Sequence, residues 1–243
     1  MALIPTVPGL AVRPVDRSTE MLAARRLHAQ CYLDAGYIAP TDLSAGGVLH
    51  DDWVPFSDYY IAVDTEADEI VGTCRIIRPS VRGFPCFQHF TMTDDAEAVF
   101  GTLDPNRCSE ISALATPRNG LQNMAISAAL YGKVWRESIR YSRAYMLAVV
   151  DDRLLRIMRR WFEFPFEAIG EPTFYMGART TPVAMYIPRT VEHLRSVNPD
   201  ALAYFSGDIS FAELNDISLD IRQHVPEHST NLIDLAVESS PLP

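Results

Sequence analysis

One carboxylate within an apolar segment is the residue of this sequence best suited to chemistry. Glu110 lies in the run Cys108–Ala115, whose other side chains are apolar or small and uncharged. Burial among such neighbours raises the pKa of a carboxylate, so that it can accept a proton near neutral pH, directly or through water. We therefore predict that Glu110 is a general base. The other interpretation is an ion pair with a nearby arginine.

Arg75 is a charged residue in a second apolar run, Glu69–Arg78, where it stands between Cys74 and Ile76. A guanidinium in such a strand either points to solvent or pairs with a carboxylate. Pairing with Glu110 across neighbouring strands would orient both side chains, and Arg75 could then hold a substrate carboxylate as a bidentate clamp. We predict that both residues are catalytic.

A nucleophilic thiol is the alternative to base catalysis. The four cysteines form no Cys-x-x-Cys pair and lie at no zinc-ligand spacing, which predicts reduced thiols and no metal site. Cys108 is close to Glu110 in the sequence and could carry a covalent intermediate if His89 approached it in space. We expect a buried structural thiol instead, because no histidine lies beside Cys108 in the sequence.

The segments around these residues alternate between strand and helix patterns. A strand–helix alternation in the second half predicts parallel pairing, and a leading hairpin predicts an antiparallel portion of the same sheet. The fold class is therefore α/β (α+β), with a mixed central sheet. The expected helices are 18–33, 94–100, 123–141, 151–162, 190–196 and 209–223; the expected strands are 59–64, 69–78, 108–115, 145–150 and two between 166 and 187.

Domain boundaries follow from composition. We expect an irregular, proline-containing segment over residues 1–17, one domain over 18–188, and an acidic extension over 189–243. No apolar run reaches the length of about 18 residues that a membrane span needs, and the amino terminus is a poor signal peptide. These features predict a cytoplasmic protein with no membrane span.

The charge balance excludes some classes of partner. The 243 residues carry a net charge of −10 with a pI near 5.0, which argues against general nucleic-acid binding and against anionic membrane surfaces. Residues 131–160, however, hold eight basic residues against three acidic ones. Four of the basic residues recur at helical spacing and predict either a docking face for an acidic protein or a solvated helix face: Lys133, Arg136, Arg140 and Arg143.

Four short strings, met in order along the chain, resemble motifs of one enzyme family. They are similar to motifs of acyl-homoserine-lactone synthases and of the related N-acyl amino acid synthases, within the GNAT acyltransferase superfamily. The resemblance covers about residues 18–188 and implies a GNAT-like sheet flanked by helices, with a C-terminal helical extension. The strings are Leu27–Leu33, Val71–Ile77, Glu110–Leu114, and Phe166–Pro172 followed by Tyr175–Gly177.

This sequence departs from the lactone synthases at three points. His28 stands where the family motif has arginine, and Ala113 stands where lactone synthases have the second arginine of their Glu-x-Ser-Arg strand. Their tryptophan after the first helix is replaced by Tyr37 and Ile38. Because that region helps lactone synthases hold S-adenosylmethionine, the departures favour a free amino acid or another amine as acceptor.

The resemblance also implies which residues bind the acceptor. His28 and Tyr32 of the first helix and Ser112 of the Glu-x-Ser strand match substrate-binding positions. In the loop before the hairpin, Asp52 best matches the acceptor-binding acids of the family, and Trp53 follows it. Acids beside aromatic rings suit an ammonium group. A solvated turn is the other interpretation of this loop.

The segment Thr116–Gly120 matches the junction that binds the pantetheine phosphates in GNAT enzymes, through backbone N–H groups at a helix N-terminus. The resemblance implies this role for Arg118, Asn119 and Gly120. The junction has one glycine and one arginine, which fits the single phosphate of an acyl carrier protein better than the three phosphates of coenzyme A. The four-residue basic set would then dock the carrier protein.

Together these features predict an N-acyltransferase that moves a fatty acyl group from acyl carrier protein to the amine of an amino acid or similar small molecule. Attack on the thioester would be direct, with no bound cofactor and with the phosphopantetheine thioester as co-substrate; acyl-CoA is the less favoured donor. Two alternatives stay open: an acyl-homoserine-lactone synthase that uses S-adenosylmethionine, and a non-catalytic protein that binds acyl carriers or lipid signals.

Overall fold

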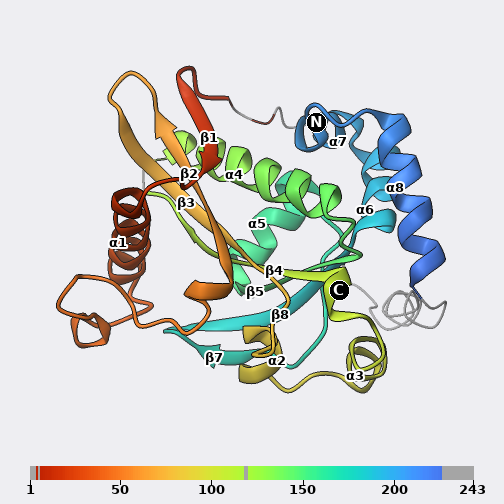
Figure 1. The fold of residues 1–243 in the computed structure, drawn as a ribbon, viewed down its shortest axis with the longest axis horizontal. Helices are drawn as coiled ribbons and strands as arrows, with labels where there is room; N and C mark the ends of the chain where they lie inside the picture. The colour runs from red at the N-terminus through yellow and green to blue at the C-terminus, as the bar shows by residue number, and fades with distance from the viewer. Residues whose placement is uncertain (1–3, 5, 118–119, 226–243) are drawn as a thin grey trace, which may run out of the picture.

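A mixed eight-stranded sheet runs through the computed structural model, which describes residues 4, 6–117 and 120–225 (Figure 1). The strand order is β1-β2-β3-β4-β5-β8-β6, and β7 also pairs with β8. The strands are β1 (Leu10–Pro14), β2 (Ser57–Asp64), β3 (Glu69–Ile77), β4 (Cys108–Ala115), β5 (Tyr145–Asp151), β6 (Glu167–Ala168), β7 (Thr173–Tyr175) and β8 (Ala178–Tyr186).

The pairing agrees with the prediction for the hairpin and only partly for the second half. β2 and β3 are antiparallel as expected, and β4 and β5 are parallel. β8 follows a helix but pairs with β5 in the antiparallel sense. The reason is that the chain after that helix makes the short strands β6 and β7 and reverses direction at Met176 and Gly177, both with positive φ, before it enters β8.

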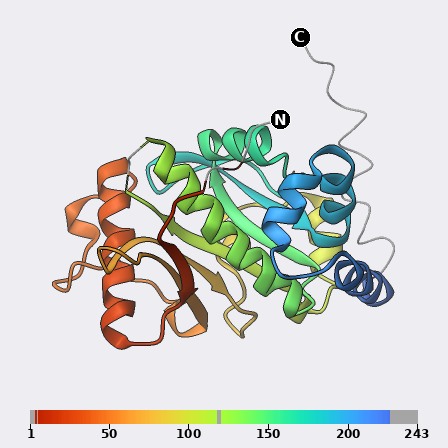
Figure 2. The same ribbon diagram turned by 90° about the horizontal axis from the view of Figure 1, so that it is seen from above.

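The helices cover both faces of the sheet. In Figure 1, α2 and α3 lie below the sheet and α4 lies above it; Figure 2 shows α4 crossing the strands. α1 lies on the same face as α2, because Ala24 of α1 packs against Ile61 of β2, and Cys86 of α2 bonds Glu110 of β4 on that face. The longer helices are α1 (Ser18–Ala35), α4 (Gly120–Arg140), α5 (Asp152–Phe162), α6 (Ile187–Val197), α7 (Pro199–Ser206) and α8 (Phe211–His224), and the shorter ones are α2 (Pro85–His89) and α3 (Asp94–Phe100).

Two segments differ from the prediction. Residues 1–17 were expected to be irregular, but Leu10–Pro14 form β1, which pairs with β2. A proline is compatible with this edge position because Pro14 ends the strand. The C-terminal extension was expected to hold two weak helices; it also contains α7, whose start is capped by the side chain of Asn198.

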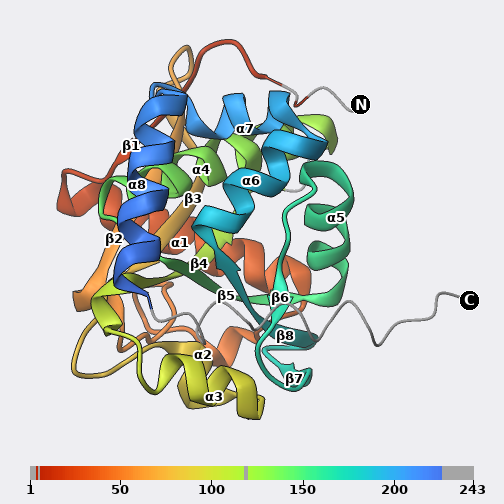
Figure 3. The same cartoon turned by 90° about the vertical axis from the view of Figure 1, so that its right-hand side faces the viewer.

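α4 is the central helix of the packing. Trp135, Leu130 and Ile139 are fully buried on it, and Trp135 stacks on Phe164. The helix contacts four strands on one side and α7 on the other, and Figure 3 shows α6, α7 and α8 gathered beside it. The described part of the acidic extension therefore completes the core over α4, and burial of that area stabilises both.

The end of α1 is fixed against the opposite end of the sheet by two contacts. Gly177 has a φ of 73°, and an added Cβ would lie 2.5 Å from the carbonyl oxygen of Gly36, so only glycine fits this approach. Tyr37 Oη donates to Asp151 Oδ2 at 2.9 Å, and Asp151 also caps α5. These contacts set where the inner face of α1 meets the sheet.

The mixed α/β class with a helical C-terminal extension is confirmed. Among the described helices, none is long and apolar enough to cross a membrane.

Candidate functional site

The candidate site lies on the sheet face that turns away from α4. Arg75 of β3 is paired in register with Tyr59 of β2 on one side and with Ser112 of β4 on the other, so the three side chains share a face. Glu110, two residues before Ser112, is on the same face and opposite Ile77. The structure thus brings the predicted residues of β3 and β4 together.

Glu110 is a buried carboxylate, 1% exposed. Its Oε2 accepts a hydrogen bond from the backbone N–H of Cys86 at 3.0 Å. Burial raises its pKa to about 7, and the hydrogen bonds from Cys86 and the charge of Arg75 limit the rise. This is the protonation behaviour that the sequence predicted for a general base.

The predicted pairing of Glu110 with Arg75 is wrong. Arg75 is opposite Ser112, and within the described residues its guanidinium makes its ion pair with Asp51 from the loop before β2. It also donates to Tyr59 Oη at 3.2 Å and to Ser112 Oγ at 3.4 Å. The interpretation of Arg75 as an outward-facing strand residue is also wrong, because the residue is 5% exposed.

Asp51, not Asp52, is the acid of this loop that reaches the site. Asp51 accepts the backbone N–H of Trp53 at 2.9 Å, and this turn directs its other oxygen to Arg75. The Asp52 side chain is 44% exposed and pairs with Arg82 at 3.0 Å. The sequence distance to the next strand could not separate two adjacent acids, since the turn sends them in different directions.

The first helix contributes two buried side chains to the same face. His28 packs edge-on against Tyr32, with ring centroids 4.1 Å apart. Burial and the charge of Arg75 lower the pKa of His28 to about 3, so its imidazole is neutral at neutral pH. Two buried nitrogens, Nε2 of His28 and Nε of Arg75, have no hydrogen-bond partner among the described residues.

A row of aromatic rings borders the site. Trp53, predicted to bind substrate, donates through Nε1 to the carbonyl of Gly83 at 3.3 Å and packs against His89. His89 in turn packs against Tyr175 at the end of β7, with ring centroids 5.3 Å apart. Burial and the carboxylates of Glu110 and Asp51 raise the pKa of Tyr175.

Sequence reasoning missed Tyr175, Cys86 and Asp51 as residues of the site. Tyr175 was part of a string that resembled the family, but no local pattern linked it to Glu110, 65 positions away in the chain. Cys86 was one of four similar cysteines. Only the tertiary packing distinguishes these residues from their neighbours.

The covalent alternative on Cys108 is not supported by the geometry. Cys108 is 2% exposed, and burial raises the pKa of its thiol to about 12, so it stays protonated. His89, the residue that could have activated it, packs in the aromatic row instead. Cys74, Cys86 and Cys108 are buried free thiols.

β4 has a bulge directly after the site. Ala113 has a φ of 51°, and the register with β3 shifts so that Thr73 faces Ala115 while Arg75 faces Ser112. An extra residue of this kind interrupts the ladder and redirects backbone groups. Ala113 thus occupies a strained backbone position at the place where lactone synthases were expected to have an arginine.

β4 and β5 separate beyond the site. Their parallel pairing ends at Ile111 and Ala148, although β4 continues to Ala115 and β5 to Asp151. α4 and α5 start beyond these diverging ends. The pantetheine residues predicted from sequence fall here: Gly120 is the first residue of α4, while Arg118 and Asn119 lie outside the described residues.

The four basic residues of α4 and its end are occupied within the chain and do not form an open face. Lys133 pairs with Glu137 at 2.6 Å, and Arg136 donates to the carbonyl of Phe205 at 3.1 Å. Arg140 pairs with Asp208 at 2.7 Å, and Arg143 donates to the carbonyl of Asn106. The extension, which the helical spacing could not reveal, covers this side of α4.

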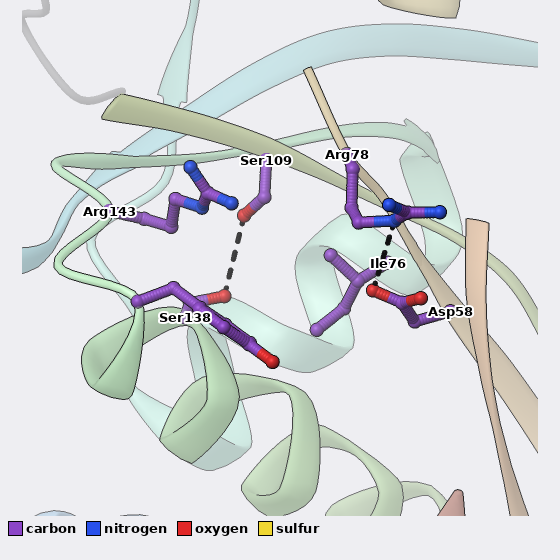
Figure 4. A pocket seen from close by; sticks show the side chains of 7 residues that line it. Asp58, Ile76, Arg78, Ser109, Ser138 and Arg143 are labelled. Atoms are coloured by element: carbon purple, nitrogen blue, oxygen red, sulfur yellow. Dashed lines mark hydrogen bonds and ion pairs between the residues drawn. The ribbon is translucent and has the colours of Figure 1, made fainter. Parts of the chain in front are cut away.

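A polar recess of about 270 Å³ lies on the α4 face of the sheet (Figure 4). Ser109 and Ser138 approach each other across it at 3.4 Å, and Arg78 pairs with Asp58 at its edge. It is separate from Glu110 and Arg75, which point to the other face. Its lining is Asp58, Ile76, Arg78, Ser109, Ser138, Tyr141 and Arg143.

The family model of the N-acyl amino acid synthase FeeM matches residues 23–187. The solved structure of FeeM, an N-acyl amino acid synthase from uncultured soil microbes, superposes with a TM-score of 0.58 at 18% identity, covering 77% of this chain and 96% of that one.

Acyl-homoserine-lactone synthases have a similar fold. The CoA-dependent synthase BjaI has a TM-score of 0.60 at 17% identity and covers 87% of this chain and 100% of its own. The synthase LasI has a TM-score of 0.55 at 14% identity, covering 73% and 89%. No curated protein matches the sequence. At these identities the structural likeness shows the fold, and it agrees with the GNAT-like sheet expected from the sequence.

Asp51→Asn tests the ion pair at the site. Loss of this charge leaves the buried Arg75 uncompensated and should lower the free energy of unfolding by about 3–5 kcal/mol, measured by urea denaturation. The matched control Asp52→Asn, at an exposed acid one position later, should change it by less than about 0.5 kcal/mol. Equal effects of the two variants would contradict the assignment of Asp51.

Proposed function

The chain belongs to the FeeM family of N-acyl amino acid synthases and is an acyltransferase, and we propose that it transfers a fatty acyl group from acyl carrier protein to the amine of a free amino acid. The observation that carries this proposal is that a buried carboxylate and two buried nitrogens without hydrogen-bond partners lie on one sheet face. Glu110 has a pKa of about 7, and Arg75 and His28 each keep a nitrogen without a partner among the described residues.

Glu110 supplies the proton transfer that amide formation needs. An amino acid enters with an ammonium group, which must lose a proton before its nitrogen can attack the thioester carbonyl. Glu110 accepts a proton from this group; the C–N bond then forms, the C–S bond breaks, and the thiolate takes up the second proton lost by nitrogen. Transfer to a base with a pKa near the working pH is efficient in both directions.

Arg75 and His28 would hold the carboxylate of the amino acid. Buried polar atoms are nearly always hydrogen-bonded, so two adjacent exceptions on the site face are explained if a ligand satisfies them. The Asp51 pair fixes the Arg75 guanidinium while its Nε–H remains available. Neutral His28 adds a hydrogen bond without a second charge, which suits a singly charged carboxylate.

The thioester would enter where β4 and β5 diverge. Ligands of open α/β sheets bind beyond the carboxyl ends of the strands, where helices begin, and the first N–H groups of such helices bind phosphate. Arg118, Asn119 and Gly120 remain the proposed pantetheine residues. The bulge at Ala113 offers redirected N–H groups that would stabilise the oxyanion of the tetrahedral intermediate.

α5 offers the basic surface that α4 does not. Arg153, Arg156 and Arg160 are exposed on it, and within the described residues they take part in none of the ion pairs. Their spacing of three and four positions places them along one side of the helix. α5 starts beyond the end of β5, where β5 separates from β4. Its exposed arginines would therefore guide an acidic carrier protein to the thioester entrance.

An assay of acceptors tests the reaction itself. With acyl carrier thioester, the protein should release carrier thiol when amino acids are added, and mass spectrometry should find the N-acyl amino acid. Thiol release that requires S-adenosylmethionine would instead show a lactone synthase. Binding of the acyl carrier without release in either case would show a non-catalytic binding protein.

Glu110→Gln tests the base. The amide cannot take up the proton, so turnover should fall by about 10²-fold or more while carrier binding is retained. In the unmodified enzyme, kcat/KM should decline as pH falls below about 7, since the base is then protonated. The control Glu167→Gln removes a half-buried carboxylate, which burial also gives a pKa of about 7. It should keep both the rate and the pH profile; turnover of Glu110→Gln within a few fold would make Glu110 structural.

Arg156→Glu tests the donor and its docking surface. Reversal of this charge should raise KM for acyl carrier protein by about tenfold, more at low salt, because it weakens electrostatic steering. kcat/KM for acyl-CoA should not change. Arg195→Glu, at an exposed arginine of α6, is the control and should leave both donors unaffected. Equal use of both donors by the unmodified protein would contradict the choice of carrier protein.

A further inference from the structure

The carboxylate of Glu110 is held by one residue of α2. Cys86 donates its backbone N–H to Oε2 at 3.0 Å, and its thiol is close enough to the carboxylate for each group to shift the pKa of the other. Cys86 is fully buried, and Glu110 is buried as well. The proposed mechanism does not assign this residue any role.

The local sequence explains why this N–H points to Glu110. Phe84 precedes the helix and offers no side-chain acceptor, and Pro85 has no N–H. Cys86 is therefore the first donor of the segment, and a buried N–H at a helix start needs an acceptor. Glu110 supplies that acceptor from β4, so the start of α2 and the base satisfy one another.

The thiol adds a second, adjustable contact. Burial and the neighbouring carboxylate raise the pKa of Cys86 well above its ordinary value, so the sulfur keeps its proton. A protonated thiol is a weak donor and stabilises the charged form of the carboxylate. Without it, burial would shift Glu110 further toward the protonated form, which cannot act as a base.

We propose that Cys86 is a positioning residue, whose N–H and thiol fix the Glu110 carboxylate and keep it available as a base at neutral pH. The proposal rests on the proposed function in taking Glu110 as the base. Serine would preserve such a contact, whereas alanine would keep only the N–H.

Other groups that face Glu110 stay constant in this comparison. Ile77 lies across from the base on β3 and carries no charge; Arg75, two positions earlier on β3, favours the charged form of Glu110 and is held by Asp51. Tyr175, at the end of β7, interacts with the same carboxylate. From β5 the neighbour in register is Leu147, which carries no charge. A change at Cys86 therefore reports on its own contact.

The experiment compares Cys86→Ala and Cys86→Ser with the unmodified chain. In Cys86→Ala the pKa of Glu110 should rise by about one unit, because a hydrogen bond to the charged form is lost. kcat/KM should then fall about fivefold at pH 7 and change less than about twofold at pH 9. Cys86→Ser should stay close to the unmodified profile. Cys74→Ala is the control, since Cys74 is an equally buried thiol on the opposite sheet face.

Two readouts separate this proposal from the proposed function. The Glu110 pKa is followed by carbon NMR of labelled glutamate in the protein without substrate, with Glu110→Gln identifying the signal, and the pH–rate profile is measured separately. The positioning role would be overturned if Glu110 had the same pKa in Cys86→Ala as in Cys74→Ala. It would also be overturned if the pKa of Glu110 rose as far in Cys86→Ser as in Cys86→Ala. If the NMR shift appears but Glu110→Gln keeps its turnover, Cys86 does control the carboxylate and the base assignment is wrong.

Discussion

Two ionisable groups buried in one sheet face are the constraint on which this structure depends. A buried charge is costly unless it is paired or neutralised, and the two groups meet this cost differently. Arg75 stays charged beside Asp51, which ties the loop before β2 to the sheet. Glu110 has no such counter-ion among the described residues, and its pKa rises to about 7. The same burial that threatens stability thus produces a base suited to neutral pH.

The two faces of the sheet have separate tasks. α4 and the C-terminal helices fill one face with apolar side chains, and Arg136 and Arg140 of α4 contact the extension at Phe205 and Asp208. The other face is covered more thinly by α1, α2 and the loop that carries Asp51, and it holds the polar site. This division explains why the basic residues of α4 pair within the chain. The arginines of α5, which starts where β4 and β5 separate, stay exposed.

The departures from the lactone-synthase motifs change the charge of the candidate site. At position 28 a neutral histidine replaces a permanent positive charge, next to an arginine that is already neutralised by Asp51. At position 113 an alanine with positive φ forms the bulge and brings no charge. The site therefore has fewer charges than the lactone-synthase motifs predict, which supports the proposal of a small amino acid as acceptor over a larger cationic one.

The sequence by itself determined the elements and the chemistry of single residues. The hairpin, β4, α4 and β5 were predicted because apolar periodicity depends on neighbours close in the chain, and Glu110 and Arg75 stood out as charges in apolar runs. The partners were decided only by tertiary structure. Register set Arg75 opposite Ser112 and not Glu110, one turn separated Asp51 from Asp52, and packing of the extension engaged Arg136 and Arg140 of α4. Each of these outcomes depends on contacts between distant segments, which local sequence patterns do not encode.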